Sequence, residues 1–203
     1  MQVLCLDLEG VLVPEIWIAF AERTGIAEFR RTTRDEPDYD KLMRWRIELL
    51  GRHGLKLADI QQVIAGLAPL PGAREFLDTM RERFQVIVLS DTFYEFADPL
   101  MRQLGRPTLF CHRLLIDDAG RVVDYRLRQP DQKRAAVNAL KALNFRVIAA
   151  GDSYNDTAML GAADAGFLIH APAAIEAQFP QFPAVHGYAE LRAAVEQAAA
   201  VLL

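Results

Sequence analysis

The sequence of 203 residues has few cysteines and no long apolar run, and each shortage excludes a class of protein. Cys5 and Cys111 are the two cysteines, and their wide separation does not indicate a disulfide framework. No apolar stretch reaches the roughly 20 residues that a membrane-spanning helix needs. The N-terminus also lacks the basic region and long apolar core of a signal peptide. We therefore expect a cytoplasmic protein with no membrane partner.

The chain also lacks an excess of basic charge. The chain has 23 Lys and Arg against 27 Asp and Glu, a net charge of -4, and no block of basic residues. Such a chain has no positive field for a nucleic-acid backbone, so we expect no nucleic-acid partner. The histidines lack the close spacing of a zinc site, and we expect ordinary surface or core residues at His53, His112, His170 and His186.

An apolar run that ends in two acids opens the chain. The run Val3-Leu4-Cys5-Leu6 has no alternation, which is typical of a strand buried on both faces of a parallel sheet. Asp7 falls at its carboxyl end and Glu9 lies just beyond, where open α/β sheets bind ligands. Two carboxylates there are costly unless a cation or substrate lies between them. An acidic strand-to-loop junction without function is the alternative interpretation.

The pattern changes near residue 70. Residues 14–70 predict helices and no strand, and they end in the linker Pro69-Leu70-Pro71-Gly72. Helix and strand patterns alternate from Gly72 onward, with buried strands predicted at 86–89 and 146–150. A hairpin is predicted around Asp118-Ala119-Gly120, weaker strands at 165–169 and 184–185, and a terminal helix over 188–203. The helical stretch therefore interrupts an α/β domain.

The two later buried strands also end in polar residues. Ser90 follows the first of them, and Asp152 and Asp156 follow the second. Between them, Lys133 lies in the first turn of a predicted helix, where the helix dipole disfavours a cation. Together with Asp7 these residues form an ordered set that acidic loops would rarely produce by chance.

This order resembles the haloacid dehalogenase superfamily of phosphohydrolases and phosphotransferases, over essentially the whole chain. The pattern is most similar to phosphoserine phosphatases, and within them to those that also transfer phosphate to homoserine. The resemblance implies a Rossmann-like, mainly parallel α/β sheet with helices on both faces, formed by residues 1–13 and 71–203. Residues 14–70 would be a small inserted helical cap domain. The four motifs match Asp7-Leu8-Glu9-Gly10-Val11, Ser90, Lys133 and Gly151-Asp152-Ser153-Tyr154-Asn155-Asp156.

The resemblance also implies catalytic roles. Asp7 would attack phosphorus and form an aspartyl-phosphate, which splits one displacement into two. Glu9, where the superfamily commonly has Asp, would act as general acid and then as general base. Ser90 and Lys133 would hold the phosphoryl oxygens.

A magnesium ion is implied in the same place. Hard carboxylate and carbonyl oxygens suit Mg²⁺, and Asp7, Asp152 and the backbone carbonyl of Glu9 would provide them. Asp156 would support the residues that bind the ion without being the main ligand itself.

The substrate contacts carry more alternatives. The resemblance assigns the ammonium group of phosphoserine to Glu15 and its carboxylate to Arg46, a residue that a solvated helix face would also explain. Asp91 is either an ammonium ligand or a helix N-cap. Asn155 either contacts substrate or shapes its loop.

We therefore expect a Mg²⁺-dependent phosphoserine phosphatase that also transfers the phosphoryl group to homoserine. Its partners would be these small molecules, and a homodimer stays open. One alternative is a phosphatase of another small phosphometabolite. Others are a signalling module phosphorylated on Asp7 and a silent binding protein, although the cap and Glu9 count against a signalling module.

Overall fold

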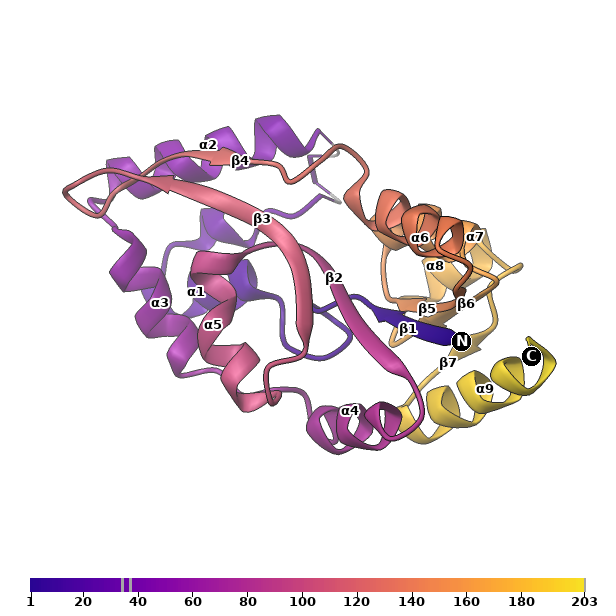
Figure 1. The fold of residues 1–203 in the computed structure, drawn as a ribbon. Coiled ribbons are helices and arrows are strands. Elements are labelled where there is room, and N and C mark those ends of the chain that lie inside the picture. The colour runs from indigo at the N-terminus through magenta and orange to yellow at the C-terminus, as the bar shows by residue number, and fades with distance from the viewer. Residues whose placement is uncertain (34, 37, 203) are drawn as a thin grey trace.

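The computed structural model describes residues 1–33, 35–36 and 38–202. Arg34 and Pro37, in the polar loop expected before the second helix, lie outside the described residues, as does Leu203, the predicted end of the terminal helix. Figure 1 shows a central sheet with helices on both sides and with the two chain ends near each other.

The sheet has seven strands in the order β4-β3-β2-β1-β5-β6-β7. Neighbouring strands pair in parallel, except that β3 and β4 form an antiparallel hairpin. This arrangement confirms the predicted α/β fold with a mainly parallel sheet. The strands are β1 (Gln2–Leu6), β2 (Gln85–Phe93), β3 (Thr108–Ile116), β4 (Val122–Arg126), β5 (Arg146–Gly151), β6 (Ala165–Ile169) and β7 (Ala184–Val185).

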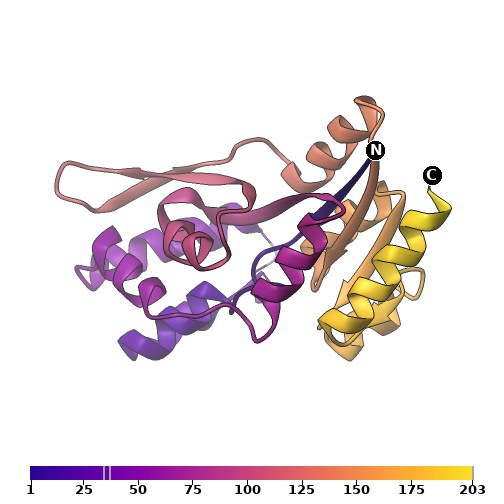
Figure 2. The same ribbon diagram turned by 60° about the horizontal axis from the view of Figure 1, so that its bottom comes forward.

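Strand β1 is buried on both faces, as its unbroken apolar run predicts. Val3 and Cys5 belong to one hydrophobic cluster, while Leu4 and Leu6 belong to another. Because successive side chains of a strand point to opposite faces, the two clusters lie on opposite sides of the sheet. The first is covered by α6 (Gln132–Ala142), α7 (Thr157–Ala162) and α8 (Ala173–Gln178), and the second by α4 (Ala73–Arg81) and α9 (Tyr188–Val201) (Figure 1, Figure 2).

The described part of residues 14–70 is helical. An aromatic cluster joins this segment to the core, because Trp17 packs against Phe20, Phe29 and Phe96 with ring centroids 5.6 to 6.0 Å apart. The division of the chain into core and cap domains stays a prediction. The helices concerned are α1 (Ile16–Thr24), the 3-10 turn η1 (Ala27–Arg30), α2 (Tyr39–Arg52), α3 (Leu57–Ala65) and, from the core, α5 (Tyr94–Gln103).

The β3–β4 hairpin lies along α2, a contact that the sequence did not predict (Figure 1). Tyr125 of β4 donates a hydrogen bond to Asp40 at 2.5 Å. At the tip of the hairpin, the carbonyl of Gly120 accepts from the N–H of Leu57 at 3.0 Å. The hairpin therefore supports the start of α2 and the start of α3.

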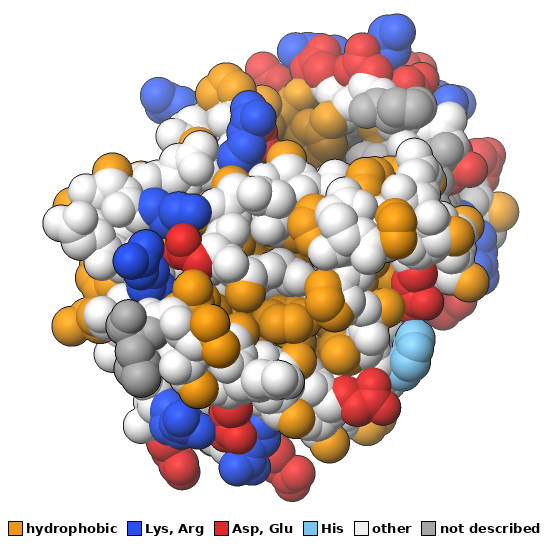
Figure 3. Space-filling view, turned by 90° about the vertical axis from the view of Figure 1, so that its right-hand side faces the viewer, with side chains coloured by type: hydrophobic (Ala, Val, Ile, Leu, Met, Phe, Trp, Pro, Cys, Tyr) orange, Lys and Arg blue, Asp and Glu red, His pale blue; other side chains and the backbone are white. Residues whose placement is uncertain are grey.

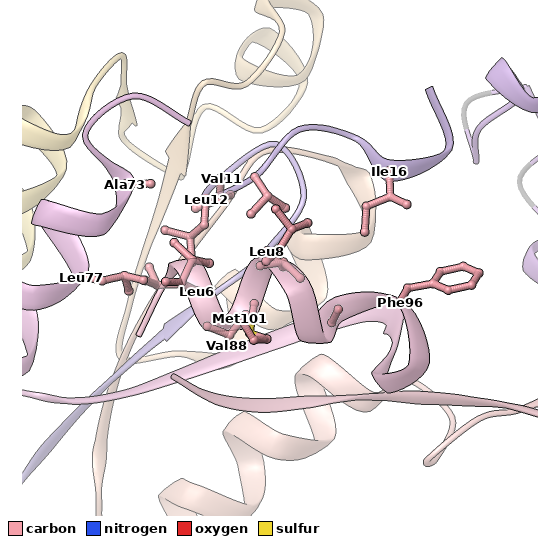
Figure 4. Packing of buried hydrophobic residues seen from close by; sticks show 14 of the residues in the cluster. Leu6, Leu8, Val11, Leu12, Ile16, Ala73, Leu77, Val88, Phe96 and Met101 are labelled. Atoms are coloured by element: carbon pink, nitrogen blue, oxygen red, sulfur yellow. The ribbon is translucent and has the colours of Figure 1, made fainter. Parts of the chain in front are cut away.

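The turn after β1 is anchored in the core. Leu8 and Leu12 are fully buried, and Figure 4 shows them with Leu6, close to Leu77 of α4 and Val88 of β2. Gly10 makes the turn with a φ of 75°, a backbone conformation that side chains with a Cβ rarely adopt. This packing fixes the strand end that carries the first two acids.

Strand β2 is longer than the sequence predicts. It continues through Ser90 to Phe93, and its pairing with β3 shifts register between Leu89 and Phe93. Residues 90–92 therefore lie in an irregular part of a strand, where β-bulges redirect side chains.

No helix among the described residues is long and apolar enough to cross a membrane. Figure 3 views the molecule from the right-hand side of Figure 1, where hydrophobic side chains gather toward the middle and charged ones lie mostly at the rim.

The aromatic cluster gives a stability prediction. Phe96→Ala should lower the free energy of unfolding by about 3 to 5 kcal/mol, because Phe96 is 1% exposed and contacts both Trp17 and Phe93. Chemical denaturation measures this change. Leu143→Ala is the matched control, since Leu143 is 68% exposed and its loss should change stability by less than about 0.5 kcal/mol. Equal effects would contradict the assigned packing.

Candidate active site

Predicted site residues from two strand ends and one helix come together in a buried cluster. The Lys133 ammonium lies 2.9 Å from Asp7 Oδ1 and 2.8 Å from Asp156 Oδ1. Asp7, Asp152 and Asp156 offer carboxylate oxygens within 4.8 Å of one another. Parallel neighbours β1 and β5 produce this arrangement, because their carboxyl ends lie side by side.

Lys133 is the positive centre of this cluster. Burial lowers the pKa of Lys133, but the carboxylates of Asp156, Asp7 and Asp91 outweigh burial and raise it well above its usual value. The side chain is therefore a fixed cation, held in the first turn of α6 against the helix dipole by the acids that face it.

The neighbouring carboxylates act on one another. Burial and then the charge of Asp156 raise the pKa of Asp7 well above its usual range, although Lys133 lowers it. The oxygens of the three buried acids lie close enough together to hold one ion, and they are the ligand type that Mg²⁺ prefers. The residues present therefore fit a magnesium ion.

Asp156 holds the surrounding loop in place. Its Oδ2 accepts hydrogen bonds from the backbone N–H groups of Asp152 and Ser153 at 3.0 and 3.1 Å, while Oδ1 accepts from Lys133. The side chain passes directly over Gly151, where a Cβ atom would lie 2.3 Å from Asp156 Cγ. Glycine is therefore required beneath this carboxylate.

Glu9 points back to the start of α1. Its Oε2 accepts the backbone N–H of Ile16 at 2.8 Å. Burial, with the charge of Glu15, raises the pKa of Glu9 to about 8. A carboxyl group with this pKa is largely protonated near neutral pH and can donate a proton.

A cavity of about 90 Å³ lies between the cluster and the helical segment that follows β1, which is called the helical insertion below. The same cavity is therefore lined both by the residues expected to bind phosphate and by those expected to bind the rest of the substrate. Its lining includes Asp7, Glu9, Glu15, Trp17, Thr32, Thr33, Tyr39, Leu42, Arg46, Ser90, Asp91, Thr92, Lys133, Asp152, Ser153 and Asn155.

Arg46 does not lie on a solvated helix face, so that alternative is wrong. It is 6% exposed, with its guanidinium 4.6 Å from the Trp17 ring and Nη2 donating to the carbonyl of Arg31 at 2.8 Å. Its Nε is buried without a hydrogen-bond partner among the described residues. The sequence held a signal, because Arg46 lies between Leu42 and Leu49 on the buried stripe of α2.

Asp91 is not a helix N-cap, because α5 begins at Tyr94 after the cap residue Phe93. Its carboxylate instead accepts from Asn155 Nδ2 at 2.9 Å and from Gln132 Nε2 at 3.2 Å. This hydrogen bond connects Asn155, which follows β5, to Asp91 and so to the buried cluster.

Sequence reasoning missed three residues around Asp91. Gln132 also donates to the carbonyl of Ser90 at 2.9 Å, and the hydroxyl of Tyr39 donates to the carbonyl of Asp91 at 2.8 Å. His112 is a buried histidine whose Nε2 lies 3.5 Å from Asp91 Oδ1. These residues line a second, adjacent cavity of about 670 Å³, and no spacing in the sequence marks them.

Known proteins share this sequence and fold. The haloacid dehalogenase-like hydrolase family matches residues 1–164. A phosphoserine phosphatase of Pseudomonas syringae pv. tomato is 67% identical over 95% of this chain and 81% of its own length. Phosphoserine phosphatase ThrH of Pseudomonas aeruginosa is also 67% identical, over 95% of this chain and 94% of its own. A substrate-bound phosphoserine phosphatase structure aligns with a TM-score of 0.77 at 20% identity, covers 97% of each chain and thus shares the fold.

The close approach of Asp156 to Gly151 gives the prediction for this site. Gly151→Ala should reduce phosphate release from p-nitrophenyl phosphate at least about tenfold, because the new Cβ must displace Asp156 and with it Lys133. Gly161→Ala is the control, since its Cβ would meet only the Phe182 ring at 3.8 Å. Equal activity of the two variants would show that the Asp156 contacts do not matter.

Proposed function

The chain belongs to the haloacid dehalogenase-like hydrolases, and from this premise we propose that it hydrolyses phosphoserine and also transfers the phosphoryl group to homoserine. Arg46 carries the substrate assignment. Its buried guanidinium group lines the cavity that also holds Asp7, and its Nε has no hydrogen-bond partner among the described residues, which suits the carboxylate of an amino-acid substrate. The two relatives at 67% identity bear the name phosphoserine phosphatase.

In the proposed reaction, Asp7 attacks the phosphorus atom and becomes an aspartyl-phosphate, while serine leaves. Glu9 protonates the departing serine oxygen, in keeping with its pKa of about 8. Lys133 and Ser90 hold the phosphoryl oxygens, and Lys133 neutralises the charge that builds up on them. Glu9 then takes a proton from the attacking water or homoserine.

Mg²⁺ is the proposed cofactor. Asp7, Asp152 and the backbone carbonyl of Glu9 would hold it, and Asp156 supports them through its bond to the N–H of Asp152. When bound, the ion supplies the positive charge that lets an anionic carboxylate approach an anionic phosphate. The three buried carboxylates, whose oxygens lie within 4.8 Å of one another, support this assignment.

The amino-acid part of the substrate would lie toward the helical insertion. Arg46 would bind its carboxylate and Glu15 its ammonium group, and both line the small cavity. Burial lowers the pKa of Arg46 only to about 10, so the guanidinium keeps its charge at neutral pH. Cytoplasmic location and a homodimer stay predictions from the sequence.

The two alternative functions that the sequence left open require different parts of this site. A phosphatase of another small phosphometabolite would keep the cluster but would not need a carboxylate contact from Arg46. A phosphoaspartate signalling module would need neither Glu9 nor an enclosed substrate cavity. The buried donor of Arg46 favours an amino-acid substrate over both.

One assay tests the proposal. Inorganic phosphate and phosphohomoserine are measured together, with phosphoserine as donor, Mg²⁺ present and homoserine added. We expect phosphate alone without homoserine and both products with it. Phosphate without any phosphohomoserine would restrict the enzyme to hydrolysis, and no turnover of phosphoserine would refute the proposed substrate.

Arg46→Ala tests the carboxylate contact. It should raise the KM for phosphoserine roughly 10- to 150-fold, the equivalent of losing a charge-assisted hydrogen bond, and leave the KM for p-nitrophenyl phosphate nearly unchanged. Arg44→Ala is the matched control, because Arg44 lies on the same helix with its side chain 63% exposed. Equal losses on both substrates would mean that Arg46 only stabilises the fold.

Glu9→Asp tests the choice between water and homoserine. The substitution withdraws the carboxyl group by about 1.5 Å, one C–C bond, which should favour small water over homoserine. We expect a lower ratio of phosphohomoserine to inorganic phosphate at fixed homoserine concentration. Glu22→Asp, an exposed residue of α1, should keep the wild-type ratio. An unchanged ratio in Glu9→Asp would assign the partition to the pocket and not to Glu9.

A further inference from the structure

The carboxylate of Asp91 faces four donors. Its Oδ1 lies 3.2 Å from Gln132 Nε2 and 3.5 Å from His112 Nε2. Its Oδ2 accepts from Asn155 Nδ2 at 2.9 Å and lies 3.7 Å from the Lys133 ammonium. Two of these donors are hydrogen-bonded to the carboxylate and the other two lie at ion-pair distance, so both of its oxygens are engaged within the site.

His112 is oriented to take part in this arrangement. Its Nδ1 accepts the backbone N–H of Arg128 at 3.1 Å, so the ring hydrogen lies on Nε2, the nitrogen that faces Asp91. Burial favours the neutral form of Asp91, yet the charge of Lys133 and the hydrogen bonds hold its pKa well below its usual range. Asp91 is therefore a fixed anion within the site.

The donors on Oδ2 belong to the phosphate-binding side of the site. Lys133 contacts Asp7 directly, and Asn155 lines both cavities. The amide oxygen of Asn155 accepts from the hydroxyl of Ser153, so Asp91 and Ser153 together fix how this amide is turned. Asp91 thus reaches the reacting centre through two other side chains.

We propose that Asp91 is a positioning residue for phosphoryl transfer, which aims Lys133 and Asn155 and does not bind the ammonium group of the substrate. Gln132 and His112 hold Asp91 from the opposite side of its carboxylate. The proposal rests on the proposed phosphatase function but not on phosphoserine as the substrate.

Asp91→Asn separates the two roles when it is assayed on two substrates. A positioning residue acts on the phosphoryl group that both substrates share, so kcat should fall about 10- to 100-fold on phosphoserine and on p-nitrophenyl phosphate alike. An ammonium ligand would instead raise the KM for phosphoserine alone, because p-nitrophenyl phosphate has no ammonium group. That second pattern, or kcat within about twofold of wild type on both substrates, would overturn the proposal.

Asp98→Asn is the matched control. Asp98 lies on α5 and pairs with Arg102 and Arg106 at the surface, so its substitution should leave both activities unchanged. If wild type hydrolyses p-nitrophenyl phosphate but not phosphoserine, the proposed substrate fails, while the p-nitrophenyl phosphate measurements still decide the role of Asp91.

Asn155→Ala provides a second variant that alters an exposed side chain and does not depend on the folding of Asp91→Asn. It should also lower kcat on both substrates. Because Asp91 acts partly through Asn155, the double variant should lose no more activity than Asp91→Asn alone. An unchanged kcat in Asn155→Ala would contradict the action of Asp91 through Asn155. So would a double variant whose loss of kcat equals the product of the two single losses.

Discussion

A buried ion cluster, Lys133 between Asp7 and Asp156, is the constraint on which the rest of the site depends. Burying a charge is costly unless opposite charges and hydrogen bonds surround it, so neither the lysine nor the acids are stable there alone. The sheet order places β1 beside β5, and α6 brings the lysine to the same edge. Asp7, Asp152 and Asp156 offer oxygens within 4.8 Å of one another, which is why the site suits a divalent cation.

The helical insertion adds a second structural constraint, which is the position of α2 relative to the sheet. Arg46 reaches the small cavity only if α2 is held at a fixed distance from the sheet, and the β3–β4 hairpin provides that support through Tyr125. Tyr39 adds a direct hydrogen bond from α2 to the backbone of Asp91. The proposed substrate contact of Arg46 and the proposed phosphate site are thus linked through β2 and the β3–β4 hairpin.

The sequence predicted the sheet and much of the cluster for simple physical reasons. Uniform apolar runs mark buried strands, and parallel strands bring their carboxyl ends together, so Asp7 and Asp152 could be expected to meet. Lys133 lies on a helix, and only the family resemblance placed it with them. The contacts of Asp91 with His112 could not be predicted, because they depend on the irregular pairing of β2 with β3 beyond Leu89. The same irregularity made the predicted strand too short.

The central claim is that Asp7 carries the phosphoryl group between donor and acceptor. The most direct measurement is an acid quench of the enzyme during turnover of phosphoserine labelled at phosphorus, followed by peptide mapping. We predict a base-labile label on the peptide that contains Asp7, and its loss when homoserine is added before the quench. Label on another residue, or steady product formation with no label and with Asp7→Asn within about tenfold of wild type, would contradict the account.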